Sequence, residues 1–153
     1  MRNVAAATSI LVAATFLLTA CGGPMGPIPG GELDGEVKPW PTDWGFTEEF
    51  ENALLETNPE DPYSVTVWGV AHHNSFYITG ASVDSVWVSN LIKHAHMKLS
   101  FSGDLYLGRA TEVTDRDEVV AILDQYVAKY DFERSEGDNF IEDGGVIFRL
   151  SER

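Results

Sequence analysis

The stretch 63–130 constrains the fold most strongly, because strand-like and helix-like patterns alternate along it in a fixed order. Over 97–102, apolar and polar side chains alternate, which is typical of a half-buried strand. Short polar turns divide the strand-like runs into two hairpins, 64–71 with 75–79 and 97–102 with 105–113. The sequence therefore predicts two antiparallel hairpins with one helix between them and another after them.

Both helices have recognisable starting residues. Asp84 or Ser85 is expected to cap the first helix, in which Trp87 and Leu91 stand one turn apart. Residues 114–117 resemble a capping box for the second helix, whose apolar residues follow helical spacing: Val119, Ile122, Leu123, Tyr126, Val127 and Tyr130. A closing strand is expected over 146–150, and Gly108 is expected to mark a bulge or bend in the second hairpin.

The first twenty residues have the pattern of a bacterial secretion signal. Arg2 precedes an apolar run over 10–18 that is too short to span a bilayer comfortably. Leu18-Thr19-Ala20-Cys21 then resembles the bacterial lipoprotein signal at every position. The resemblance implies that Cys21 carries a thioether-linked diacylglycerol and an amide-linked acyl chain such as palmitate, which anchor the chain to a membrane. An ordinary signal peptide or a transmembrane anchor is the alternative.

Lipoproteins retained in the inner membrane typically carry Asp after the lipidated cysteine, and this chain has Gly22 there. The resemblance therefore implies the outer membrane, with the domain facing the periplasm. Residues 21–31 are predicted to be a tether, because prolines and glycines dominate them and they carry no charge. Residues 32–62 are predicted to be an acidic, aromatic N-terminal arm packed on a domain over 63–153. Thr47 begins either a short helix or an extended run there. A lid over a pocket is the functional alternative for the aromatic side chains of the arm.

Charge excludes one large class of partner. The chain has 24 acidic and 10 basic residues, with a formal net charge of −14 at pH 7. Such a charge repels nucleic acids and anionic lipid head groups. We therefore expect no nucleic-acid partner, and we expect anchoring to come from the lipid and not from a basic patch. Cys21 is the only cysteine, so no disulfide can form within the chain.

The order of elements, together with Trp87-Val88-Ser89-Asn90-Leu91 and the ribbon over 109–115, resembles the split β-barrel superfamily. That group includes pyridoxamine-phosphate-oxidase-like flavoproteins and a deazaflavin (F420)-dependent nitroreductase-like branch. The resemblance implies an α+β fold, a mostly antiparallel split barrel of about six strands with two helices. It also implies a homodimer.

The same resemblance implies a cofactor, FMN or an F420-like ring. The ring would lie against the first hairpin and the start of the first helix, near six residues: Tyr77, Thr79, Ser82, Ser85, Trp87 and Asn90. Amide groups at the helix N-terminus would hold a phosphate. The turn 72–74 and the loop 80–84 contain no arginine or lysine. As an alternative, Trp87 serves only to pack the helix on the core.

No other catalytic pattern stands out. His72, His73, His94 and His96 invite a metal or haem interpretation, but their spacing matches no metal-binding motif, and we expect no metal site.

Two functions remain open. The first is a lipid-anchored split-barrel oxidoreductase, or a degenerate one, that uses FMN or a related ring. The second is a non-catalytic envelope lipoprotein that binds a small apolar molecule or another protein.

Overall fold

The computed structural model describes residues 22–131, 134 and 139–153. Cys21 and the predicted signal peptide therefore lie outside the described residues. The elements follow in this order: β1 (Glu36–Val37), η1 (Gly45–Glu49), β2 (Ala53–Thr57), β3 (Tyr63–Val67), β4 (Gly69–His72), β5 (Ser75–Gly80), α1 (Val86–Lys93), β6 (His96–Phe101), β7 (Asp104–Glu112), α2 (Arg116–Tyr130) and β8 (Val146–Glu152).

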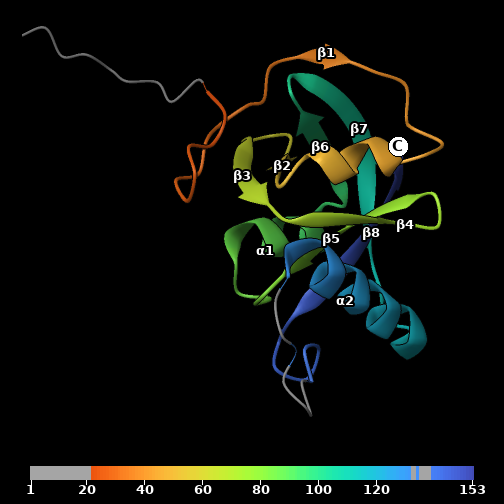
Figure 1. Cartoon of the computed structure of the whole chain (residues 1–153). Coiled ribbons are helices and arrows are strands. Elements are labelled where there is room, and N and C mark those ends of the chain that lie inside the picture. Colours follow the sequence, from red (N-terminus) through yellow and green to blue (C-terminus); the bar gives the residue numbers. More distant parts are fainter. Residues whose placement is uncertain (1–21, 132–133, 135–138) are drawn as a thin grey trace, which may run out of the picture.

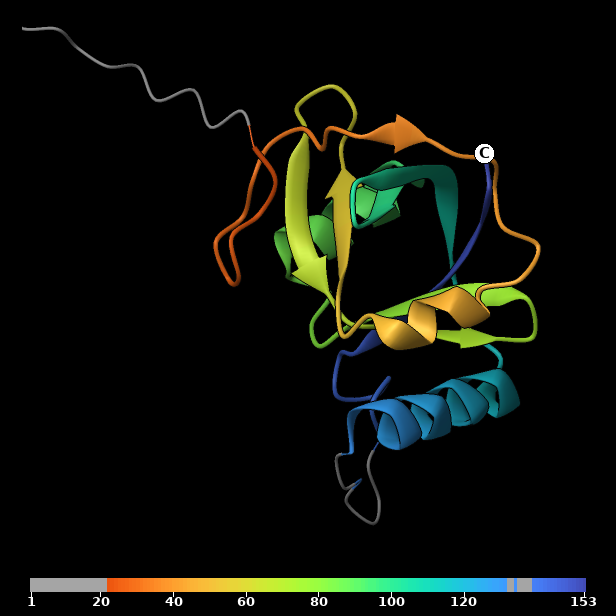
Figure 2. The same ribbon diagram turned by 45° about the horizontal axis from the view of Figure 1, so that its top comes forward.

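The strands form one curled sheet in the order β3-β2-β6-β7-β8-β5-β4, and β1 pairs in parallel with β7. Every other pairing is antiparallel. The sheet curves around an interior, and α2 runs along its outside next to β4 (Figures 1 and 2). This confirms the predicted α+β split barrel with two helices, although the sheet has eight strands instead of about six.

The run 64–71, predicted as one strand, is two strands divided at Trp68. β3 and β4 are the two ends of the strand order, so Trp68 joins the two edges of the sheet. Helix α2 supplies hydrogen bonds to the backbone there. The Tyr126 hydroxyl donates to the carbonyl of Trp68 at 3.1 Å, and the N–H of Gly69 donates to the Tyr130 hydroxyl at 3.0 Å. The barrel is therefore split where β3 and β4 diverge.

The N-terminal arm belongs to the barrel itself. β2 lies between β3 and β6, so residues predicted as arm form a central strand. Trp44 is only 1% exposed and packs among Phe76, Phe101 and Tyr106 inside the barrel. Thr47 begins no α-helix and lies in the 3-10 helix η1. The expected boundary at residue 63 therefore does not separate two units, because the core requires residues on both sides of it.

The segment 22–31 is also joined to the barrel. Gly30 and Ser64 exchange two backbone hydrogen bonds of 2.9 Å, and the N–H of Gly31 donates to the carbonyl of Gly22 at 3.0 Å. Met25 and Ile28 pair across a tight turn. The structure thus differs from a free tether. The composition of the segment 22–31 suggested flexibility, but the segment hydrogen-bonds to the edge strand β3.

Two hydrophobic clusters account for most of the burial. The barrel interior contains Phe76, Ile78, Leu99 and Phe101, as the alternation in their strands predicts. The second cluster lies between the outer face of the sheet and α2, and it contains these residues: Val70, Tyr77, Val113, Val119, Ile122, Leu123, Tyr126 and Ile147. Alternate faces of β5 thus serve two different cores.

The predicted N-cap of α2 is wrong, and the structure excludes one of the two alternatives predicted for Gly108, the bulge. The N-cap of α2 is Asp115 and not Thr114, and its carboxylate accepts a hydrogen bond from the N–H of Glu118 at 2.9 Å. Gly108 pairs regularly with Met97 and Glu152, so it marks no bulge. A Cβ on Gly108 would come within 2.6 Å of the Trp40 ring, so the glycine allows the arm to pack closely on β7.

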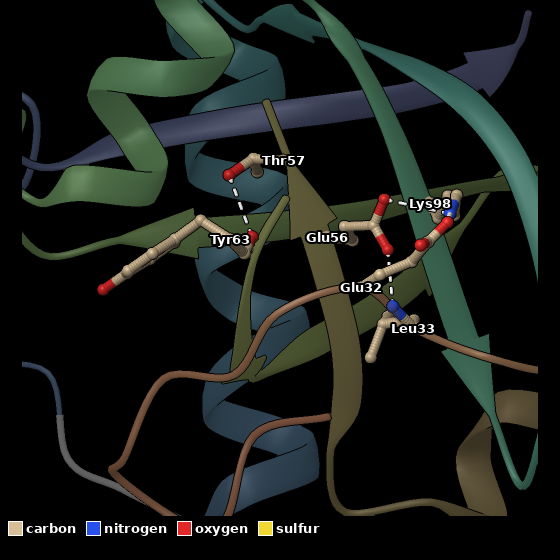
Figure 3. Close-up of polar contacts among 6 residues, drawn as sticks. All are labelled: Glu32, Leu33, Glu56, Thr57, Tyr63 and Lys98. Carbon is tan, nitrogen blue, oxygen red and sulfur yellow. Dashed lines mark hydrogen bonds and ion pairs between the residues drawn. The ribbon is translucent and has the colours of Figure 1, made fainter. Parts of the chain in front are cut away.

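A buried carboxylate of β2 fastens the start of the arm to the barrel (Figure 3). Glu56 is 3% exposed, and its Oε2 atom accepts a hydrogen bond from the N–H of Leu33 at 2.6 Å. Its Oε1 atom lies 3.0 Å from Nζ of Lys98, which also pairs with Glu32 at 3.1 Å. Burial lowers the pKa of Lys98, but its hydrogen bonds to the two carboxylates outweigh burial, and the net shift is upward.

Candidate functional site

An open groove of about 580 Å³ lies where the barrel is split. It is bordered by the end of β3, the bend at Trp68, the end of β5, the start of α1 and one side of α2. Its lining includes Thr66, Trp68, Thr79, Ser85, Trp87 and Tyr126. The volume lies within the range typical of pockets that hold small molecules and cofactors.

Gly80 determines how closely α1 approaches the sheet. A Cβ at this position would meet Val88 Cγ2 at 2.6 Å and the Trp87 ring at 3.1 Å. Because no side chain intervenes, the Trp87 indole packs on the end of β5 and also borders the groove. The glycine therefore places an aromatic wall beside the hydroxyl of Thr79.

The N-terminus of α1 faces the same groove. Ser85 is the N-cap residue, and within the described part of the chain its side chain makes no capping hydrogen bond. The first amide groups of a helix have no partner within the helix, and together with the helix dipole they favour an anion. Ser85 thus brings a hydroxyl and a weakly positive helix end to the groove.

Three of the six residues predicted to surround a cofactor line this groove: Thr79, Ser85 and Trp87. The other three point elsewhere. The Tyr77 hydroxyl donates to Oε1 of Glu118 at 2.8 Å, under α2. Asn90 donates from Nδ2 to the hydroxyl of Thr57 at 3.1 Å, and the Ser82 hydroxyl accepts from the N–H of Asp84 at 3.1 Å.

Sequence reasoning missed Trp68, which borders the groove opposite Trp87. Trp68 is 47% exposed, and its ring stacks on Tyr130 with centroids 4.4 Å apart and planes 10° apart. No local sequence signal marked it, because the run 64–71 has an unbroken strand-like composition. Only the position of α2 shows that Trp68 borders a groove.

Arg134 also lines the groove, and sequence reasoning did not assign it a role. Its Nη1 atom lies 3.0 Å from Oδ1 of Asp124, so a carboxylate already offsets its charge. It lies about fifty residues beyond the loops 72–74 and 80–84, which contain no arginine or lysine. Arg134 and Trp87 are far apart in the sequence, and the fold brings both to the lining of the groove.

Burial shifts the pKa of two side chains on α2, Tyr126 and Lys129. It raises the pKa of the Tyr126 phenol, whose hydroxyl also donates to the carbonyl of Tyr77 at 3.2 Å. Burial lowers the pKa of Lys129, whose ammonium donates to the carbonyls of Thr47 and Gly69 at 3.1 and 3.0 Å. Tyr126 therefore stays neutral and acts as a hydrogen-bond donor to the barrel backbone.

No helix among the described residues is long and apolar enough to cross a membrane. Histidine, cysteine, aspartate and glutamate side chains form no group of three or more suited to a metal ion in the part of the chain that the structure describes. His72 and His73 do lie together, with ring centroids 4.0 Å apart, in the turn between β4 and β5.

No protein-family model matches the chain, and no curated protein sequence matches it. Several solved structures share its fold. A conserved hypothetical protein from Mycobacterium tuberculosis is 15% identical, with a TM-score of 0.57 over 71% of this chain and 76% of its own. A Listeria innocua protein proposed to be a pyridoxamine 5′-phosphate oxidase is 10% identical, with a TM-score of 0.51 over 68% and 85%.

The heme storage protein HutZ from Vibrio cholerae is 12% identical, with a TM-score of 0.53 over 71% of this chain and 85% of its own. Identities this low show a common fold and no more. The chain has the split β-barrel fold that the sequence resemblance implied.

Proposed function

We propose that this chain is a lipid-anchored bacterial envelope protein whose split barrel binds a flat ring cofactor of the flavin type. The observation that carries the proposal is the groove at the split, where Trp87 and Trp68 border the same opening as the hydroxyls of Thr79 and Ser85. Aromatic walls suit a flat ring, and a few convergent hydroxyls fix its orientation.

The residues present fit such a group. Trp87 and Trp68 would hold the ring, and Thr79 would donate or accept at its polar edge. The α1 N-terminus at Ser85 would face a phosphate, with Arg134 as the nearby cation. A flavin supplies redox chemistry when bound, while the protein contributes binding, orientation and exclusion of water. We assign no catalytic residue, because the described lining contains no acid–base pair held by a hydrogen bond.

The experiment is a visible absorption spectrum of the purified mature chain, recorded as isolated and after addition of FMN, F420 or haem. A stoichiometric chromophore with a shifted spectrum supports the proposal. A colourless chain whose added ligands keep their free spectra contradicts it.

A second candidate is a non-catalytic protein that binds a small apolar molecule in the same groove. Its support is the composition of the lining, in which Val67, Leu123 and Phe140 join the tryptophans, and the pairing of Arg134 with Asp124. Displacement of a fluorescent apolar probe by fatty acids, but not by FMN, distinguishes this candidate from the first.

Anchoring through Cys21 is a separate part of the proposal, and its support is the complete signal pattern of residues 18–21. Mass spectrometry of the mature chain from membranes should find acyl groups on an N-terminal Cys21, and Cys21→Ser should accumulate as an unprocessed precursor. An unmodified mature chain of the same length would contradict it.

A further inference from the structure

The turn 25–28 exposes two apolar side chains that the proposed function does not use. Met25 and Ile28 exchange two backbone hydrogen bonds of 3.0 Å across Gly26 and Pro27. Met25 is 73% exposed, and Ile28 is 59% exposed. Paired residues of an antiparallel ladder point to the same side, so the two side chains form one small apolar surface. The turn extends beyond β3 as an orange loop (Figures 1 and 2).

This turn is held to the barrel at its base. The Gly22 carbonyl accepts from Gly31, and Gly30 is paired with Ser64 at the start of β3. A Cβ on Gly23 would contact Leu33 and Leu54, so the backbone before the turn lies against the domain. The turn therefore has a defined position relative to the barrel from Gly22 onward.

Lipidation of Cys21 would place this turn at a bilayer, and the inference rests on that part of the proposed function. Gly22 is bonded directly to Cys21, and Met25 is four residues from it, which allows a separation of at most about 14 Å. With Cys21 acylated, its acyl chains would enter the hydrocarbon layer, and the cysteine itself would lie in the head-group region. Because the chain is folded onto the barrel from Gly22 onward, no flexible linker separates the domain from that region.

The chemistry of the turn suits a lipid surface. Residues 22–31 carry no charge, whereas the chain as a whole is strongly acidic. Acidic side chains are repelled by anionic lipids, so a neutral apolar segment is the part of this protein that best tolerates the head-group layer. The free energy of exposed apolar side chains falls when they enter the boundary between head groups and acyl chains.

We infer that Met25 and Ile28 insert into the membrane surface beside the lipidated Cys21, so that the turn is a second contact which fixes the orientation of the barrel on the bilayer. The partner is the lipid surface, and the contact needs no basic patch.

The test uses the lipidated full-length product in vesicles of phosphatidylethanolamine and phosphatidylglycerol. Acylation blocks the thiol of Cys21, so Ile28→Cys introduces one reactive thiol for an environment-sensitive fluorophore. Val120→Cys, at a site 42% exposed on α2, is the matched control. Lipids with brominated acyl chains should quench the label at position 28 and leave the label at position 120 unchanged. Circular dichroism verifies that both variants are folded.

Three results would overturn the inference, and each has a distinct cause. If the chain is acylated and bound to vesicles but the label at position 28 is not quenched, the lipid anchor exists and the turn does not contact the membrane. A blue-shifted emission without bromine quenching means that the turn packs on a second protein copy. A mature chain without acyl groups refutes the anchoring itself.

A second variant measures the contribution of the side chains. Met25→Ser combined with Ile28→Ser should leave acylation unchanged and should speed the transfer of the lipidated chain between vesicles about tenfold, because two partly buried apolar groups are lost. An unchanged transfer rate would contradict insertion.

Discussion

The carboxylate of Glu56 and the backbone N–H of Leu33 form a hydrogen bond of 2.6 Å that joins the central strand β2 to the start of the N-terminal arm. Glu56 is 3% exposed, and its other oxygen pairs with Lys98 on the neighbouring strand β6. One side chain thus satisfies a backbone donor of the arm and a cation of the barrel wall (Figure 3). The arm is fixed by specific polar contacts as well as by its aromatic residues.

Glu56→Ala should therefore destabilise the protein by about 2–3 kcal/mol, because it leaves the Leu33 N–H and the Lys98 ammonium without this partner. Urea unfolding followed by circular dichroism measures the change. Glu60→Ala removes an exposed carboxylate and should stay within about 0.5 kcal/mol of the wild type. Equal effects of the two variants would mean that the contact to the arm contributes nothing specific.

Trp44→Ala tests whether the arm is part of the core. Trp44 is 1% exposed among the aromatic residues of the barrel interior, so we expect a loss of about 3–5 kcal/mol. Phe46→Ala is the control. Phe46 is 38% exposed, and its removal should cost about 1 kcal/mol. If Trp44→Ala unfolded at the same urea concentration as the wild type, the arm would be a dispensable cover.

Gly80→Ala tests the close approach of α1 to β5. The added Cβ would lie 2.6 Å from Val88 Cγ2, so the helix must shift, at a cost of about 1–3 kcal/mol. Gly45→Ala is a matched control, because its Cβ would meet only the exposed Asp43 carboxylate, at 3.3 Å. Thermal unfolding compares the two variants. We also expect Gly80→Ala to weaken any ligand held in the groove, since the Trp87 wall moves with the helix.

The burial of Tyr126 predicts a loss of stability at alkaline pH. Its folded pKa is raised above the ordinary 10.0, so above pH 10 the unfolded chain releases this proton while the folded chain keeps it. Stability therefore falls as the pH rises. Tyr126→Phe should cost about 1 kcal/mol at pH 7 through its lost hydrogen bonds. At pH 11 the wild type should lose about 1.4 kcal/mol that Tyr126→Phe does not lose, so the difference should vanish or slightly reverse. Urea unfolding at both pH values measures it, and an unchanged difference would contradict the assignment.

How far the sequence predicts this protein depends on the range of the interactions involved. Alternation along β5 puts Phe76 and Ile78 on one face and Tyr77 and Thr79 on the other; the first two lie inside the barrel, and Tyr77 belongs to the cluster under α2. It did not show that α2 covers Tyr77 while Thr79 borders the groove, because the position of a helix along a strand depends on distant contacts. Asn90 shares a helix with Trp87, but its amide reaches Thr57, which lies far away in the sequence.

The bend at Trp68 illustrates the same limit. The run 64–71 has an unbroken strand-like composition, and the division into β3 and β4 depends on hydroxyl groups of Tyr126 and Tyr130 about sixty residues later. The same long-range contacts create the groove. Three of the six residues that the sequence assigned to a cofactor site therefore line it, whereas Trp68 and Arg134, which also line it, were not predicted.

The most direct test of the proposed function is a fluorescence titration of FMN with the mature wild-type chain, Trp87→Ala and Ile92→Ala. Ile92 lies on the same helix but is 57% exposed and outside the groove lining, so it controls for a general effect on α1. We expect the wild type and Ile92→Ala to bind FMN alike and Trp87→Ala to bind about tenfold more weakly or worse, because a wall of the ring site is lost. No binding by the wild type, or equal binding by both variants, would contradict a flavin site at the split of this barrel.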